Sequence, residues 1–122
     1  MGIDYLPHYR DKLRQVGADP SVVDALVEQM LAAPEDFDKL APRLRNAANA
    51  LDWYYDQDYS AVALHAAAAR ASDPGLRRKM LALALDRASW CASCATSGGE
   101  GTARSSHVRE LEAAMDALPP PN

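Results

Sequence analysis

Residues that favour β-strands are scarce in this sequence. Its 122 residues include one Ile, six Val and two Thr, but 24 Ala. β-branched residues pack well on the surface of a sheet, whereas Ala has the highest helix propensity. The scarcity excludes a sheet of several strands, and the composition predicts an all-α fold in a single domain.

The sequence also lacks the features of secreted and membrane proteins. Two cysteines are too few for a disulfide-stapled scaffold. No apolar run approaches the roughly 18 residues of a spanning helix, and residues 1–10 have neither the basic nor the apolar region of a secretory signal. We therefore expect a cytoplasmic protein with no membrane partner.

Positive charge is in deficit, above all in the first half of the chain. Lys and Arg total 13 against 17 Asp and Glu, a net charge of −4 with a pI near 5.2. Residues 1–58 hold 11 acidic and 6 basic side chains. A protein that binds duplex nucleic acid needs a basic face. The charge argues against a duplex nucleic acid partner and favours a basic protein partner.

Apolar residues recur every three or four positions, which is typical of amphipathic helices. Gly17 should end the first helix, Asp19-Pro20 and Asp73-Pro74 should start two others, and Asp58 should cap another. Pro34 and Pro42 should confine residues 35–40 to one or two turns. The predicted helices cover about 5–16, 20–33, 42–55, 59–71 and 74–94, with a last one after a glycine-rich loop. The expected fold is a single-domain antiparallel helical bundle of five to six helices over residues 1–118, followed by a proline-rich tail at 119–122.

Aromatic and acidic residues gather in one segment, from Asp52 to Tyr59. Consecutive residues of a helix step by about 100°, so these rings cannot all face one core. Exposed Trp and Tyr among carboxylates are typical of protein interfaces. The alternative is that the tyrosines pack inside and the aspartates cap a helix break. The candidate partner-binding residues are Asp52, Trp53, Tyr54, Asp56, Asp58 and Tyr59, with Asp36 and Asp38 extending the acidic face.

Cys91 and Cys94 have the CxxC spacing of redox and zinc sites. They should lie late in a helix, where the negative end of the dipole raises a thiol pKa, so the alternative is two small buried residues. His107 could reach them across the glycine-rich loop, giving at most three ligands. His65 is set aside, because in a hairpin that turns at residue 73 it should face about residue 81.

The glycine-rich stretch 96–102 is the second candidate for chemistry. Its backbone could bind a small anion at the start of the last helix, although Glu100 would repel one. His107 and Glu110, three residues apart, could form an acid–base pair or be solvated surface groups. The candidate ligand-binding residues are Gly98, Gly99, Gly101, Arg104 and His107.

No motif supplies a catalytic arrangement, a set of four metal ligands or a cofactor site, and no family resemblance is specific enough to name. We therefore expect no catalytic residue, no cofactor and no metal, and an enzyme is the less favoured class. The sequence favours a small acidic protein-binding module: an inhibitor, an immunity-type antitoxin or an adaptor for a basic partner. The alternative is a small-ligand, metal or redox sensor that uses residues 96–102 with His107, Cys91 and Cys94. Self-association is left open.

Overall fold

The computed structural model describes residues 6–51, 58–93 and 98–119, with the side chains of 98–105 excepted. These residues form an all-helical bundle without strands, which confirms the predicted fold class. The elements are α1 (Leu6–Gln15), α2 (Ser21–Ala32), the 3-10 turn η2 (Pro34–Asp36), α3 (Phe37–Ala50), α4 (Tyr59–Ala68), α5 (Pro74–Ser93) and α6 (Gly98–Asp116). Among the described residues, no helix combines the length and the apolar character needed to cross a membrane.

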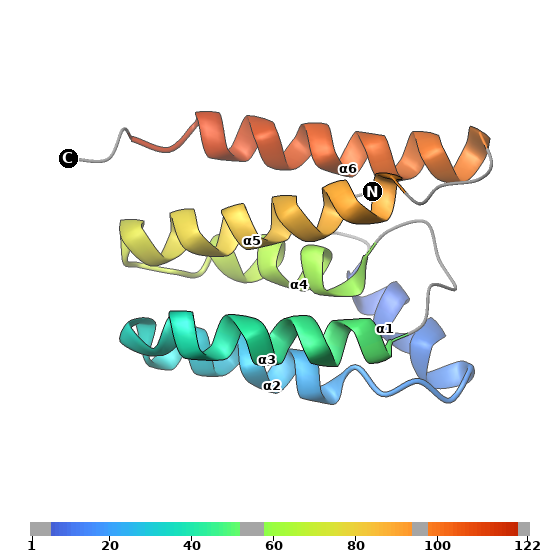
Figure 1. Ribbon diagram of the computed structural model, residues 1–122, viewed down its shortest axis with the longest axis horizontal. Coiled ribbons are helices and arrows are strands. Elements are labelled where there is room, and N and C mark those ends of the chain that lie inside the picture. Colours follow the sequence, from blue (N-terminus) through green and yellow to red (C-terminus); the bar gives the residue numbers. More distant parts are fainter. Residues whose placement is uncertain (1–5, 52–57, 94–97, 120–122) are drawn as a thin grey trace.

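The helices stack in layers around α4. In Figure 1, α2 and α3 lie at one side of the molecule, α4 and α5 in the middle, and α6 at the opposite side. Helix α4 contacts α1, α2, α3 and α5, whereas α6 packs against α5. Helix α6 is thus an outer helix attached mainly to one neighbour.

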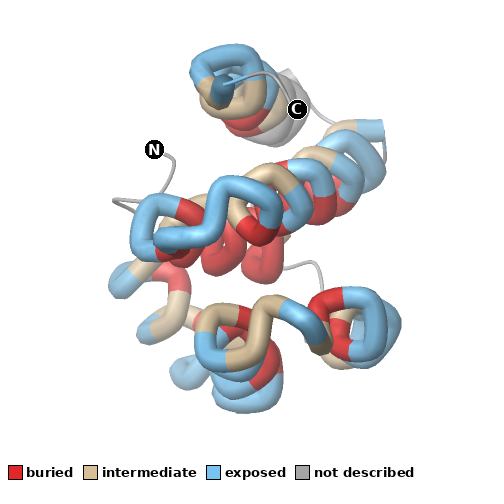
Figure 2. The backbone as a smooth tube through the Cα atoms, turned by 90° about the vertical axis from the view of Figure 1, so that its left-hand side faces the viewer, coloured by how far each residue is buried: buried red, intermediate tan, exposed pale blue. Residues whose placement is uncertain are grey.

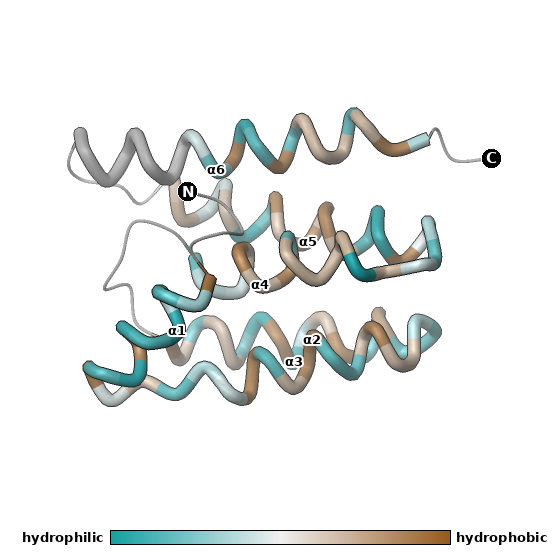
Figure 3. The backbone as a smooth tube through the Cα atoms, turned by 180° about the vertical axis from the view of Figure 1, so that it is seen from behind, coloured by the Kyte–Doolittle hydropathy of each residue, from teal (hydrophilic) through white to brown (hydrophobic). Residues whose placement is uncertain are grey.

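Helix α4 is central because its residues are small and apolar. Eight of its 10 residues are buried, and Figure 2 shows the buried parts of the helices turned toward the middle of the bundle. In Figure 3 most of α4 is pale to brown, whereas α6 alternates between hydrophilic and hydrophobic residues. Alanine side chains hold helix axes apart very little, so four elements can pack closely around α4.

Several helix ends follow the sequence signals. Gly17 has a φ of +83°, the left-handed conformation that ends α1. An Asp58 carboxylate oxygen accepts a hydrogen bond of 3.0 Å from the Ala61 backbone N–H and caps α4. Asp73 accepts one of 2.8 Å from the Gly75 N–H, beside the predicted start of α5 at Pro74. The α4–α5 hairpin therefore turns where the sequence predicts.

The prediction of a helix boundary at Pro42 is wrong. Helix α3 begins at Phe37 and runs through Pro42 to Ala50. Its buried residues step by three, four and four, so one apolar stripe continues past the proline: Phe37, Leu40, Leu44 and Ala48. Pro42 lies on the exposed face in the second turn, where its ring disturbs one early hydrogen bond while the core contacts on both sides keep the helix continuous.

The prediction of a loop over residues 96–102 is also wrong for its described part. Helix α6 begins at Gly98, so Gly98, Gly99 and Gly101 have helical backbone. Each glycine disfavours a helix by about 1 kcal/mol relative to alanine. The packing of α6 along α5 outweighs this local preference.

Candidate metal centre between α4 and α6

Two of the predicted partner-binding residues have structural roles. Tyr59 is only 3% exposed. Its hydroxyl donates a 2.6 Å hydrogen bond to Asp24 and accepts one of 3.0 Å from Arg10, and its ring meets that of Tyr9 edge-on. Burial, followed by the bond to Asp24, raises the pKa of Tyr59 far above its ordinary value. Tyr59 thus ties α4 to α1 and α2.

Asp58 belongs to a second buried network. Its other carboxylate oxygen accepts a 2.9 Å bond from Arg87, and the two side chains are only 11% and 8% exposed. The same guanidinium donates to Asn49 at 2.8 Å and lies over the ring of Trp90. Arg87 therefore joins the end of α3 to the start of α4, on either side of residues 52–57.

The remaining predicted residues are placed as follows. Asp36 is half-buried at the end of η2, and the exposed Asp38 carboxylate lies 3.6 Å from the Lys79 ammonium. Cys91 is a buried thiol of α5. Five predicted residues lie outside the described part of the chain: Asp52, Trp53, Tyr54, Asp56 and Cys94. The side chain of Arg104 also lies outside it. Binding of a partner by residues 52–59, or of an anion by residues 96–102 with Arg104 and His107, stays a prediction.

The structure brings together three metal-ligating side chains from two helices. Among the described residues, one such group exists: His65 of α4 with His107 and Glu110 of α6, whose ligand atoms all lie within 4.8 Å of one another. Nδ1 of His65 is 3.4 Å from Nε2 of His107. The two rings are nearly parallel, with centroids 5.6 Å apart. Glu110 follows His107 by three residues and so shares its face of α6.

His107 is a buried histidine, not the solvated surface group of the alternative sequence interpretation. It is 1% exposed, and its Nδ1 has no hydrogen-bond partner among the described residues. Burial, followed by the neighbouring His65, lowers the pKa of His107 to about 4. Burial also lowers the pKa of His65, against the opposing effect of the Glu110 carboxylate. Both imidazoles are therefore neutral at pH 7, the form that binds a metal ion.

The spacing of the two nitrogens fits a shared ion better than a direct hydrogen bond. Good hydrogen bonds to N–H groups span about 2.7–3.2 Å, and the two nitrogens are 3.4 Å apart. Two nitrogens at about 2.0–2.1 Å from a tetrahedral zinc ion lie roughly 3.3–3.4 Å from each other. Glu110 is exposed, and its carboxylate oxygen lies within 4.8 Å of both nitrogens.

His65 was not predicted as a ligand because the hairpin geometry involves α4 and α5 alone. His65 does lie near residue 81, since His65 and Leu81 line one pocket. Helix α6 then passes along the same side and adds His107 and Glu110. In the sequence, the spacing of three residues between His107 and Glu110 was the pattern that could have indicated this site. Cys91 is not part of this group.

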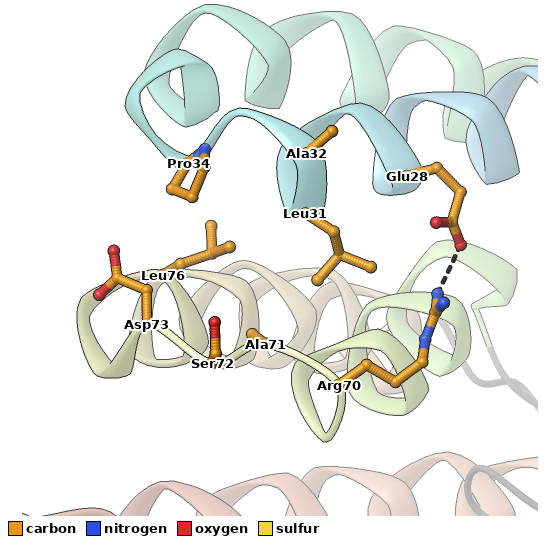
Figure 4. A pocket seen from close by; sticks show the side chains of 9 residues that line it. All are labelled: Glu28, Leu31, Ala32, Pro34, Arg70, Ala71, Ser72, Asp73 and Leu76. Carbon is orange, nitrogen blue, oxygen red and sulfur yellow. Dashed lines mark hydrogen bonds and ion pairs between the residues drawn. The ribbon is translucent and has the colours of Figure 1, made fainter.

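Two pockets differ in whether the arginine in their wall forms an ion pair with a carboxylate. A groove of about 360 Å³ separates the end of α2 from the α4–α5 turn, and Figure 4 shows Leu31 and Leu76 reaching into it from opposite sides, with Arg70 paired to Glu28 at one end. A second pocket of about 320 Å³ lies between α4, α5 and α6, with His65 and Arg77 in its wall. The second pocket adjoins the histidine group.

Comparisons of the chain with protein-family models, with curated proteins and with solved structures find no match.

Proposed function

We propose that this protein is a metal-responsive helical module that binds a divalent transition metal ion, with Zn²⁺ as the first candidate, through His65, His107 and Glu110. The observation that carries the proposal is the pair of neutral histidine nitrogens 3.4 Å apart, with a carboxylate oxygen in the same cluster. This replaces the cysteine and glycine-loop ligands of the sensor hypothesis with residues of α4 and α6.

The donor set suits zinc. Two imidazoles and one carboxylate are ligands that Zn²⁺ accepts at tetrahedral sites, and such three-ligand sites leave a fourth position for water or an exogenous ligand. Hard cations such as Mg²⁺ prefer sites built from oxygen alone. The same donors also suit Fe²⁺, Co²⁺, Ni²⁺ and Cu²⁺, so the metal titration has to include competitors.

The site supports sensing rather than permanent structural binding. A neutral histidine that binds metal through Nε2 carries its proton on Nδ1, and Nδ1 of His107 has no acceptor among the described residues. Missing partners of this kind lower metal affinity about 10–100-fold. Reversible occupancy at moderate affinity is what a responsive module requires.

Metal binding has a conformational consequence because of where α6 lies. Among the described side chains of α6, His107 and Leu111 are the buried ones, and the helix packs mainly on α5. An ion held by His65 and His107 would fasten α6 to the central α4 as well. The metal-loaded and metal-free proteins would then differ in how firmly α6 is held.

The test is a titration of metal-free protein with Zn²⁺ by calorimetry, and with Co²⁺ by visible absorption, which reports tetrahedral coordination. His65→Gln, His107→Gln and Glu110→Gln should each weaken binding at least about tenfold. His8→Gln is the matched control, because His8 is the third histidine of the chain and lies outside the cluster. Circular dichroism of each metal-free variant shows whether the fold is kept.

Two outcomes would overturn the proposal. One is the absence of stoichiometric Zn²⁺ or Co²⁺ binding by the folded wild type. The other is binding that survives the three substitutions and is lost in Cys91→Ser, which would place the metal at the cysteines.

A further inference from the structure

We infer that the pocket between α4, α5 and α6 binds a small organic carboxylate with an apolar body, held at its charged end by Arg77. The pocket has a volume of about 320 Å³. Six of its lining residues are apolar: Ala68, Ala69, Leu81, Ala114, Ala117 and Leu118. His65 and Arg77 complete the wall.

The positively charged guanidinium of Arg77 has no acidic partner among the described residues. Its Nε is buried and has no hydrogen-bond partner among the described residues. One of its terminal nitrogens donates to the Ala71 carbonyl, which belongs to the turn after α4. The guanidinium thus has no anionic partner among the described residues, and a carboxylate in the pocket would form charge-assisted hydrogen bonds with its terminal nitrogens.

The contrast with the other arginines at hollows supports this assignment. Arg70, in the groove of Figure 4, pairs with Glu28, and Arg10, in a smaller hollow beside α1, pairs with Asp24 at 3.0 Å. Their charges are neutralised within the protein. Within the described part of the chain no carboxylate forms an ion pair with Arg77, although its pocket is the most apolar of the three in composition. An unpaired guanidinium beside alanine and leucine side chains is complementary to an anion with a hydrocarbon body.

The dimensions restrict the size of the ligand. Small-molecule pockets span about 300–1,000 Å³, so this one lies near the lower limit. A single cationic group favours a monocarboxylate over a polyanion such as a nucleotide. A short aliphatic or a monocyclic aromatic acid fits both conditions, and hexanoate is a suitable probe.

The experiment is an NMR titration of the metal-free full chain with hexanoate, with 1-hexanol as the uncharged probe of the same body. Hexanoate should shift the methyl signals of the pocket alanines, above all Ala68, Ala69 and Ala114, and should bind at least about tenfold more tightly than 1-hexanol. Arg77→Gln should remove this preference for the acid. Arg45→Gln is the matched control, since Arg45 pairs with Asp86 away from the pocket.

A second variant keeps the inference testable if Arg77→Gln does not fold. Ala117→Leu adds bulk to the pocket wall at the exposed position directly after α6 and should weaken hexanoate binding while the helix content is unchanged. Equal binding of hexanoate and 1-hexanol, no binding, or hexanoate shifts that Ala117→Leu leaves unaltered would each overturn the inference.

The metal-free condition separates this inference from the proposed function. The carboxylate site depends on Arg77 and not on an ion, so hexanoate binding should persist in a protein that binds no zinc. Hexanoate binding that requires Zn²⁺ and ignores Arg77→Gln would overturn the inference, because the carboxylate would then be a ligand of the metal.

Discussion

Replacing Asp58 by alanine should destabilise the protein severely. One carboxylate oxygen accepts from the Ala61 N–H and from the Ser60 hydroxyl at the start of α4, and the other accepts from Arg87. Arg87 and Asp58 are among the least exposed charged side chains of the described chain. The substitution removes the cap and leaves the guanidinium without an anion.

The two losses can be sized separately because they involve different oxygens. Loss of an N-cap costs about 1 kcal/mol. Breaking a buried ion pair by removing one partner costs about 3–5 kcal/mol. Arg87 keeps its bond to Asn49 and its contact with Trp90, which favours the low end. We expect a loss of about 4 kcal/mol, a large share of the roughly 5–15 kcal/mol of a typical domain.

The assay is urea denaturation at pH 7.5 followed by far-UV circular dichroism. Asp58→Asn should be milder than Asp58→Ala by about 1 kcal/mol, because asparagine caps a helix as well as aspartate does. The control is Asp86→Ala, which removes an exposed ion pair with Arg45 and should cost less than about 1 kcal/mol.

One result would refute the reasoning. If Asp58→Ala cost no more than Asp86→Ala, the Arg87–Asp58 pair could not be a buried structural contact. Asp58 would then be available to a protein partner, as the interface hypothesis predicts.

Three further outcomes are expected. Burial lowers the pKa of His107 from 6.5 to about 4, so the unfolded chain takes up the proton first as the pH falls. The free energy of unfolding of the metal-free protein should therefore be unaffected by this histidine above pH 6.5 and should fall by roughly 3 kcal/mol between pH 6.5 and 4. His107→Leu should flatten that dependence in urea denaturation, and an unchanged slope would contradict the buried neutral histidine. Tyr59→Phe removes the hydroxyl that bonds Asp24 and Arg10, and should lower the free energy of unfolding by about 1–2 kcal/mol. If the segment 52–59 binds a basic protein, the double variant Trp53→Ala/Asp56→Ala should lose that partner in an affinity pull-down while its circular dichroism is unchanged; loss of the fold would mean that Trp53 belongs to the core.

Local signals in the sequence predicted most of the fold. The caps at Asp58 and Asp73 and the left-handed Gly17 depend on neighbouring residues alone, and the structure has them where expected. The errors at Pro42 and at Gly98 have one physical cause. A proline or a glycine weakens a helix locally, but contacts with other helices decide whether the helix continues.

The candidate site was harder to predict because its residues come from two helices, α4 and α6, and α6 packs mainly on a third, α5. The hairpin rule correctly put His65 near residue 81, but nothing in the local pattern fixes the side on which the last helix returns. His107 was a candidate beside the cysteines, with the glycine-rich stretch and with Glu110, but not beside His65. Its burial depends on the packing of α6, which the apolar spacing of α6 does not specify.

The metal site and the carboxylate pocket are not independent in space, because His65 belongs to both. A ligand that shifts the His65 ring changes the position of one metal ligand, and a bound ion fixes that ring in the pocket wall. By thermodynamic linkage, any factor by which hexanoate changes the affinity for Zn²⁺ must equal the factor by which Zn²⁺ changes the affinity for hexanoate. Two titrations, each with and without the other ligand, therefore measure one coupling free energy twice. Factors different from one would show that the two sites are coupled, as the shared His65 predicts, and factors of one would mean that the ring holds its position when either ligand binds.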